Sequence, residues 1–330
     1  MKRLPSLLSA GMVILLALTA NPTAPLTAEK PALAKPSYVT LLRLPYRQDR
    51  LGISRGVTAD PITGEVFVCD WRHGRIVIFD EALLFRFMMS GARFTSSPIE
   101  VAVDPNGFLL VLPSADAPMT YLDFDGAFLG EVSLVDLPDN LPSPARITSV
   151  ALSPAGDTIY AVDSNNLRVW LAGRDGKVHG SINLGEGRDE KESADLILGH
   201  VDVYQDTVLV AAPTDGSVYL YDLAGRPRGM VGQHGTAPCQ TAFPVAAALD
   251  SEGRVIIVDN QRAVVSIWEP EGNKCQLEFG GFGNAPGRFY RPQDLTLDGK
   301  GRIFVSQGFE GRVQIYQHSS PAAGTPKPQD

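Results

Sequence analysis

Few of the residues on which most enzyme active sites depend occur in this sequence. Its 330 residues include only three cysteines and five histidines. It contains no H-E-x-x-H zinc motif, no G-x-S-x-G nucleophile motif, no phosphate-binding loop and no C-x-x-C pair. No stretch therefore carries a decisive catalytic signature.

Positive charge is also scarce, because 29 Lys and Arg residues stand against 37 Asp and Glu, giving a formal net charge of -8. A generic nucleic-acid-binding protein needs a basic surface that neutralises phosphates, so no nucleic-acid partner is expected. Glycine (32) and proline (25) are plentiful and separate many short apolar runs. This pattern favours an all-β fold.

The one long apolar stretch lies at the amino terminus. Lys2 and Arg3 precede an apolar segment at residues 7–19, which is shorter than the roughly 20 residues of a membrane span. Residues 1–36 are therefore predicted to be a signal peptide and a flexible leader, and the protein is expected to be exported to the periplasm or the extracellular space. Cleavage after Ala20, cleavage after Ala34 and an uncleaved anchor are the alternatives; only the last would leave a membrane contact.

A repeat organises the rest of the sequence. Its cleanest copy spans residues 281–316 and contains three short strands, expected at 294–297, 302–306 and 312–316. Similar units begin near residues 55, 100, 149, 200 and 246, at intervals of roughly 40–50 residues, as in propeller blades. The strands are apolar on both faces, so a single unit cannot bury them and the units must stack around an axis.

The repeated pattern is an apolar strand ending in Asp, a Gly turn, a strand ending in Val-x-Asp, and then Arg followed by an apolar strand. In this pattern residues 57–79, 149–170 and 294–316 resemble the NHL repeat, and the resemblance covers most of residues 38–316. It implies an all-β, six-bladed β-propeller over residues 37–318, in which a strand at 38–44 pairs with the last blade and closes the ring. Residues 319–330 are Pro-rich and are predicted to be a disordered tail.

Export would permit a disulfide. Cys239 is expected in a loop before a strand, and Cys275 after a turn at the opposite end of the same blade. Disulfide Cα atoms must lie within about 7 Å of each other, so three free and mostly buried thiols, including Cys69, are favoured over a Cys239–Cys275 bridge.

Two kinds of loop share one face of such a propeller: those that lead into an innermost strand and those that join the second strand of a blade to the third. We call this the loop face. Arginines and aromatic residues, Phe282 and Phe309 among them, are abundant in these loops for an acidic protein. Such side chains are typical of interfaces and anionic ligand sites, although solvated loop charge is the alternative. The residues expected to contact a partner are Arg47, Arg50, Arg55, Trp71, Arg72, Arg262, Arg288, Tyr290 and Arg291.

The predicted function is a non-catalytic binding scaffold for a protein, a peptide or a cell-envelope glycan, with no resident cofactor. A purely structural spacer is the third possibility.

A second candidate site follows from aligning the innermost strands. One position in each blade falls at the same level of the channel: Gly56, Glu100, Ser149, His200, Ala246 and Asp294. Glu100, His200 and Asp294 come from alternate blades and together have the donor types that hold a divalent cation, calcium or zinc. The alternative is that each makes only local hydrogen bonds.

The rival function is a metal-dependent hydrolase or lyase at the channel mouth. The family resemblance includes lactonase-like enzymes, which would use the Glu100 and Asp294 set, and amidating lyases that bind zinc through histidines. A three-histidine site of His73, His200 and His234 is the corresponding variant.

Recurrent charged residues at the strand ends are expected to be structural. Asp70, Asp163 and Asp259 end second strands and are expected to accept backbone N–H groups of the following loop. Arg75, Arg168 and Arg312 begin third strands and are expected to pair between blades.

Overall fold

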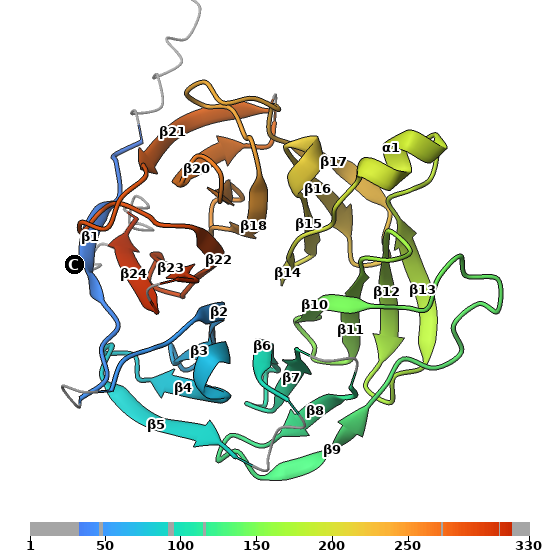
Figure 1. Ribbon diagram of the computed structural model, residues 1–330, viewed down its shortest axis with the longest axis horizontal. Coiled ribbons are helices and arrows are strands. Elements are labelled where there is room, and N and C mark those ends of the chain that lie inside the picture. Colours follow the sequence, from blue (N-terminus) through green and yellow to red (C-terminus); the bar gives the residue numbers. More distant parts are fainter. Residues whose placement is uncertain are drawn as a thin grey trace, which may run out of the picture. The chain divides into compact units, whose positions relative to one another are not determined.

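The computed structural model describes residues 33–45, 49–91, 96–114, 117–271, 273–309 and 311–318. Within these ranges the chain forms six four-stranded antiparallel sheets in a ring (Figure 1). The protein is therefore a six-bladed β-propeller, as predicted. Residues 1–32, the predicted tail 319–330 and Arg47 lie outside the described residues. Among the described residues, no helix has the length and apolar character needed to cross a membrane.

Each blade runs outward from an innermost strand beside the axis. Blade one contains β2 (Ser54–Ala59), β3 (Val66–Asp70), β4 (Arg75–Phe79) and β5 (Phe85–Ser90). Blade two contains β6 (Pro98–Val103), β7 (Leu109–Pro113), β8 (Met119–Leu122) and β9 (Phe128–Val132). Blade three contains β10 (Ile147–Leu152), β11 (Thr158–Asp163), β12 (Arg168–Gly173) and β13 (Val178–Asn183).

The second half of the ring follows the same order. Blade four contains β14 (Val201–Tyr204), β15 (Thr207–Ala212), β16 (Ser217–Asp222) and β17 (Pro227–Val231). Blade five contains β18 (Pro244–Leu249), β19 (Val255–Asp259), β20 (Val264–Glu269) and β21 (Lys274–Gly280). Blade six contains β22 (Pro292–Leu297), β23 (Arg302–Gln307), β24 (Arg312–Gln317) and β1 (Ser37–Leu41). The helical segments are α1 (Glu190–Asp195) and the 3₁₀ turns η1 (Trp71–His73) and η2 (Pro213–Asp215).

The turn between the first two strands of a blade is built by its aspartate. In blade five, Asp250 Oδ1 accepts the N–H groups of Glu252 and Arg254, each at 2.9 Å, and Gly253 takes the positive φ (77°) that closes the turn. Asp104 and Asp298 bind their turns in the same way. These turns lie at the end of the axis opposite to the loop face, and we call that side the turn face.

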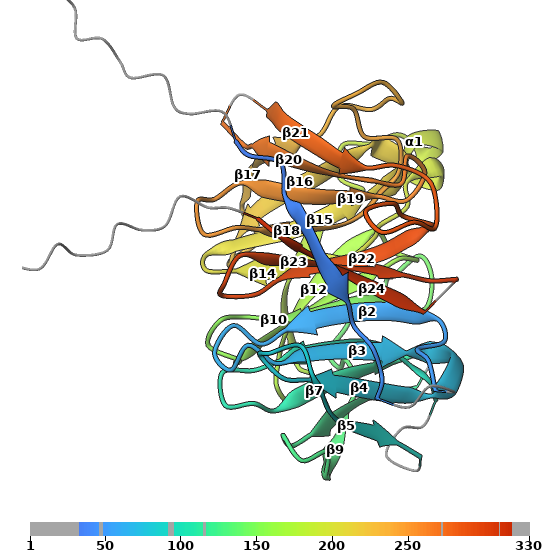
Figure 2. The same ribbon diagram turned by 90° about the vertical axis from the view of Figure 1, so that its left-hand side faces the viewer.

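The two ends of the described chain meet in blade six. β1 pairs antiparallel with β24, from Ser37 opposite Gln317 to Leu41 opposite Gln314, and Leu42 N–H continues the pairing to Val313 O. Figure 2 views the ring from the side that carries β1. The prediction of closure by an amino-terminal strand is confirmed, although the strand ends at Leu41. Pro45, which lacks an N–H group, follows where the chain leaves the edge.

The aspartates at the ends of the second strands hold the loop face together. Asp70 Oδ1 accepts Gly52 N–H, Asp163 Oδ1 accepts Arg146 N–H, and Asp259 Oδ2 accepts the N–H groups of Ala242 and Phe243. Each bond ties a second strand to the loop that leads into its own blade. The structural interpretation of these aspartates is therefore confirmed, although only Asp163 and Asp259 also accept N–H groups of the following loop, from Asn165 and Arg262. The two kinds of loop lie on the same face.

The prediction that the arginines opening the third strands pair between blades is wrong. Arg75 pairs with Asp70 of its own blade and with Asp49 in the loop leading into that blade. Arg168 donates to Ser181 Oγ of its own blade, and Arg312 donates to the carbonyl of Asn284 in the loop leading into blade six. The third strand lies inside its sheet, so the nearest acceptors belong to the same blade.

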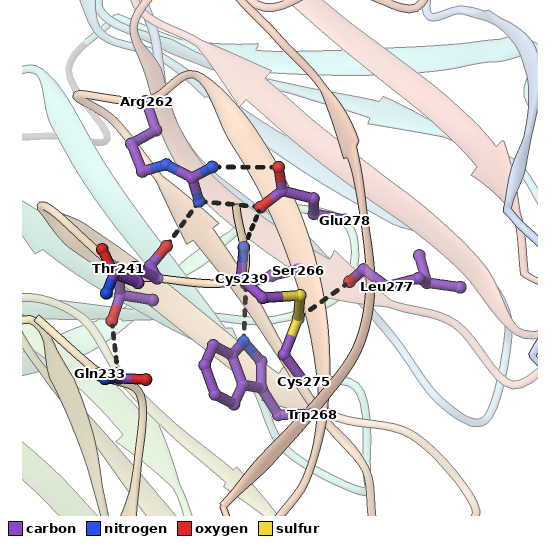
Figure 3. The surroundings of a disulfide bond; sticks show 10 residues. Gln233, Cys239, Thr241, Arg262, Ser266, Trp268, Cys275, Leu277 and Glu278 are labelled. Atoms are coloured by element: carbon purple, nitrogen blue, oxygen red, sulfur yellow. Dashed lines mark hydrogen bonds and ion pairs between the residues drawn. A yellow bond between two sulfur atoms is a disulfide. The ribbon is translucent and has the colours of Figure 1, made fainter. Parts of the chain in front are cut away.

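The expectation of three free thiols is also wrong. Cys239 and Cys275 form a disulfide with their Cα atoms 5.6 Å apart (Figure 3). Cys69 is free and fully buried. Cys239 N–H also donates to Glu278, which lies on β21 as Cys275 does. The loop between β17 and β18 therefore runs along the outer strand of blade five. From the sequence, Cys239 and Cys275 were instead expected at opposite ends of this blade.

Removal of the disulfide should weaken the fold without changing it. The bridge closes a loop of 36 residues, for which chain entropy predicts a loss of about 3–4 kcal/mol when Cys275→Ser is introduced. Urea unfolding of the variant should show this loss relative to the wild type. Cys69→Ala tests a thiol outside the bridge and should respond to reductant as the wild type does. Equal unfolding of oxidised and reduced wild type would contradict the bridge.

Removal of β1 should open the ring. A chain that begins at Leu42 leaves the β24 edge unpaired, and we expect it to lose about 3–5 kcal/mol and to associate through that edge. Urea unfolding and light scattering measure both effects. A chain that begins at Pro36 retains β1 and serves as the control. Identical stability of the two truncated chains would show that closure does not depend on this strand.

Candidate functional site

Exposed and half-buried side chains of the adjacent blades six and one gather on the loop face. One hydrogen bond joins the two blades here, because the side-chain Oγ of Ser306 in blade six donates to the carbonyl of Arg55 in blade one at 2.8 Å. We call the surface the aromatic–arginine patch. Its residues are Arg50, Arg55, Trp71, Arg72, Phe282, Arg288, Tyr290, Arg291 and Phe309.

Three aromatic rings form a row along the blade-six half of the patch. The centroids of Phe282 and Tyr290 are 5.3 Å apart and those of Tyr290 and Phe309 are 6.2 Å apart. The rings meet at 57° and 83°, so no ring stacks flat on its neighbour. Phe282 is 71% exposed and Phe309 is 63% exposed, which leaves much of their apolar surface in water.

Arginines lie over the aromatic rings of the patch. Arg291 Cζ is 5.2 Å from the centroid of Phe309, and Arg55 Cζ is 5.6 Å from the centroid of Trp71. Contacts of this kind hold a guanidinium over a ring face and keep its N–H groups available for a ligand.

The charge of these arginines is not neutralised within the described part of the chain. Arg50, Arg55, Arg72, Arg288 and Arg291 form no ion pair with a described carboxylate, and Arg288 donates only to the carbonyl of Gly280. Such guanidinium groups are suited to paired hydrogen bonds with a carboxylate of a ligand.

Arg262 differs from the other predicted contact residues. Its side chain is only 10% exposed, and its guanidinium binds both carboxylate oxygens of Glu278 and the carbonyl of Gln240 (Figure 3). Its charge is already paired, and it braces the loop that carries Cys239.

Phe282 and Phe309 were placed on the loop face from the sequence but were not named among the contact residues. The structure makes them the most exposed large apolar side chains of the patch. A signal for Phe282 lies in the sequence, because it stands between Gly281 and Gly283, whose φ angles are 106° and 148°. A bulky side chain between two such glycines stands on a loop tip.

The second candidate site lies where the innermost strands approach the axis. Gly56, Glu100, Ser149, His200, Ala246 and Asp294 occupy the same level, opposite equivalent residues of the second strands. In five of these strands the pairing shifts register immediately before this level. β-Bulges redirect side chains, which brings this position toward the channel.

Glu100, His200 and Asp294 meet across the channel. His200 Nε2 is 2.9 Å from Glu100 Oε1 and 3.6 Å from Asp294 Oδ1. Ser149 Oγ donates to Glu100 Oε1 at 3.0 Å and accepts Val201 N–H at 2.9 Å. The structure therefore brings the three predicted residues together, and it adds Ser149 to the network.

The two carboxylates also bind the backbone of neighbouring strands. Glu100 Oε2 accepts Val150 N–H at 3.2 Å, and Asp294 Oδ2 accepts Val57 N–H at 2.9 Å. Each carboxylate thus joins its own blade to the next. Glycine at position 56 lets the innermost strands of blades one and two lie close together, since a Cβ atom there would be only 2.8 Å from Ile99 O.

The electrostatics favour a positively charged imidazole. Burial alone would lower the pKa of His200, but the carboxylates of Asp294 and Glu100 raise it to about 10. Burial raises the pKa of Asp294 to about 6, although His200 opposes that shift. Burial also raises the pKa of Asp202, one strand position beyond Val201. The two carboxyl groups thus favour the imidazolium form of His200 at neutral pH.

This network separates two cavities along the axis. A cavity of about 470 Å³ lies toward the turn face and is lined by Asp60, Asp202 and the inner strands. A cavity of about 200 Å³ lies toward the loop face and is lined by Arg55 and Gln293. Glu100 and His200 line both, so they form the partition between them.

A metal ion at this position would have to displace the proton of His200, because metal ligation requires a neutral imidazole. Among the residues that the structure describes, no group of three or more His, Cys, Asp or Glu side chains is arranged to hold a metal ion. His73, part of the three-histidine alternative, binds Asp70 at 2.8 Å. The calcium or zinc site at Glu100, His200 and Asp294 stays a prediction from the sequence.

Comparison with known proteins adds no family assignment: no protein-family model matches the chain, and no curated protein matches it.

Replacement of His200 by Gln should destabilise the protein most near neutral pH. The pKa of His200 is about 10 in the folded protein and 6.5 ordinarily, so its stabilisation is complete below pH 6.5 and is lost as the pH rises toward 10. At pH 7 we expect a loss of about 3–5 kcal/mol, because Glu100 and Asp294 would face each other without a cation. Urea unfolding at pH 7 and pH 9.5 should show a smaller difference from the wild type at the higher pH.

His234→Gln is the matched control, since His234 is exposed on the loop face. It should leave stability unchanged at both pH values. A His200→Gln deficit of equal size at pH 7 and pH 9.5 would contradict the charged network.

Proposed function

We propose that this chain is an exported NHL-type β-propeller that acts as a non-catalytic binding scaffold. Its ligand is an acidic, apolar-bearing segment of a protein or peptide, which binds to the aromatic–arginine patch. The observation that carries the proposal is the combination of arginines that form no ion pair with a described carboxylate and a row of aromatic rings on one face of an acidic protein.

A protein ligand is favoured over a glycan. Aromatic residues and arginine are enriched in protein interfaces, and they dominate the binding energy of such interfaces. The rings of Phe282, Tyr290 and Phe309 provide apolar surface for side chains of a ligand, and Arg291 lies beside them for a carboxylate. Rigid strands carry these loops, as is usual for recognition sites.

Two further elements of the proposal rest on sequence and chemistry. The NHL assignment is supported by the strand-ending aspartates and the Gly turns that recur in the blades. Export is supported by the signal-like residues 1–36 and by the Cys239–Cys275 bridge, since disulfides persist in oxidising compartments.

Selection from a random peptide library tests the proposal. The mature protein should enrich peptides that combine Asp or Glu with a large apolar residue. The variant Trp71→Ala/Arg72→Ala/Arg291→Ala should bind the enriched peptides at least about tenfold more weakly, because interface hot spots of these types each contribute more than about 1 kcal/mol.

A matched control removes the same kinds of side chain from the turn face. Phe124, Phe128 and Arg226 are exposed and lie away from the patch, so replacing all three by Ala should leave peptide binding unchanged. Enrichment of basic peptides would overturn the proposal, as would equal binding by both triple variants. Failure of every peptide, with patch-dependent binding of an acidic polysaccharide such as hyaluronate, would assign the face to a glycan instead.

A further inference from the structure

The loop that leads into blade four presents negative charge on the loop face. It contains α1 and the exposed carboxylates of Glu186, Asp189, Glu190, Glu192 and Asp195. Lys191 is the one exposed lysine among them, and none of the five acids forms an ion pair with a described residue. Beside them, Ile197 is 49% exposed. The loop thus carries the acidic side chains that the aromatic–arginine patch lacks, next to an exposed apolar side chain that could pack on the rings of the patch.

This acidic loop is held in a fixed position. Asp189 caps α1 by accepting Glu192 N–H, and the Glu192 side chain accepts Asp189 N–H in return. Arg188 binds Asp215 at 2.5 Å and Tyr219 Oη at 2.8 Å, and Ile197 N–H donates to Thr214 Oγ1 at 2.9 Å. Leu196 and Leu198 are buried on either side of Ile197. A partner would therefore meet an ordered surface, which lowers the entropic cost of binding.

The acidic loop and the patch lie on the same face at opposite sides of the channel. In the side view α1 and the η1 end of blade one both lie at the right-hand side (Figure 2). In the axial view α1 lies beside blades three and four, across the ring from blades six and one (Figure 1). Two such faces placed together around a two-fold axis in their common plane bring each patch against the partner's acidic loop.

We propose that the occupant of the aromatic–arginine patch is the α1 loop of a second copy of this chain, in a face-to-face dimer with two-fold symmetry. The symmetry makes the contact twice, once in each direction. Arg72 and Arg291 meet the carboxylates of α1, and Phe282 and Phe309 meet Ile197. A stable interface buries about 800 Å² on each partner, so these apolar contacts are needed in addition to the charge pairs.

This inference rests on the proposed function, because it names the ligand of the same patch. It goes further in requiring a second surface, the α1 loop, which the peptide-binding proposal does not use. The two proposals can therefore fail separately.

The test is a charge exchange between the two surfaces of the mature, full-length protein. One variant carries Arg72→Glu and Arg291→Glu; the other carries Glu190→Arg and Asp195→Arg, which leaves the Asp189–Glu192 cap intact. Sedimentation equilibrium at low salt should give the mass of two chains for the wild type, with dissociation as salt is added. Each variant alone should dimerise at least about a hundredfold more weakly, because its charges then repel across both contacts.

Mixing the two variants in equal amounts should restore association to within about threefold of the wild type, because each substituted patch then meets a substituted loop. Thermal melts establish that both variants are folded. A wild type that stays monomeric at millimolar concentration, variants that dimerise normally, or a mixture that does not recover would each overturn the dimer. Should the wild type be monomeric while the Trp71→Ala/Arg72→Ala/Arg291→Ala variant still loses the library peptides, the proposed function stands and only the second copy is excluded.

Discussion

Hydrogen bonding between β1 and β24 joins the beginning and the end of the described chain, and the rest of the architecture depends on that pairing. Each sheet is apolar on both faces and needs a neighbouring sheet on each side. In an open stack the first and the last blade would each leave one apolar face exposed to solvent. Closure places blade six against blade one, and we call this junction the seam. Both the charged network in the channel and the aromatic–arginine patch include contacts between these two blades. Asp294 of blade six binds Val57 N–H of blade one, and Ser306 of blade six binds the carbonyl of Arg55.

The same seam explains why the aromatic–arginine patch is composed of distant parts of the sequence. Trp71 and Arg72 follow the first complete strand pair, whereas Tyr290 and Phe309 belong to the last blade. The loops that carry them are tied to second strands by Asp70 in blade one and by Gln307 Oε1, which accepts Tyr290 N–H, in blade six. An otherwise acidic protein therefore has a local region of exposed guanidinium groups on a stiff support.

The sequence was sufficient for the fold and for the level of each inner strand, because a repeat with aspartate-based turns determines strand direction and register. It also placed Glu100, His200 and Asp294 at one level, since residues aligned in a repeat occupy equivalent positions around an axis. It was not sufficient for the path of individual loops. Cys239 has a φ of 56°, and the equivalent position in the loop of the next blade is Gly287 with a φ of 82°. The repeat pattern therefore describes the backbone of this loop, but it does not show that the side chain of Cys239 bonds to Cys275 on β21. Likewise, nothing local distinguishes Arg262, paired with Glu278, from Arg291, which lies over Phe309. These outcomes depend on contacts between separate loops.

The contact of His200 with Glu100 and Asp294 divides the space along the propeller axis into two cavities. Since these side chains stand between the two axial cavities, the propeller is a disc with two recesses and not a tube. A solute that enters the cavity at the turn face meets the carboxylates of Asp60 and Asp202, whereas one that enters at the loop face meets Arg55 and the side chain of His200. The two faces of the propeller thus offer a ligand two chemically different axial cavities, which share Glu100 and His200 in their walls.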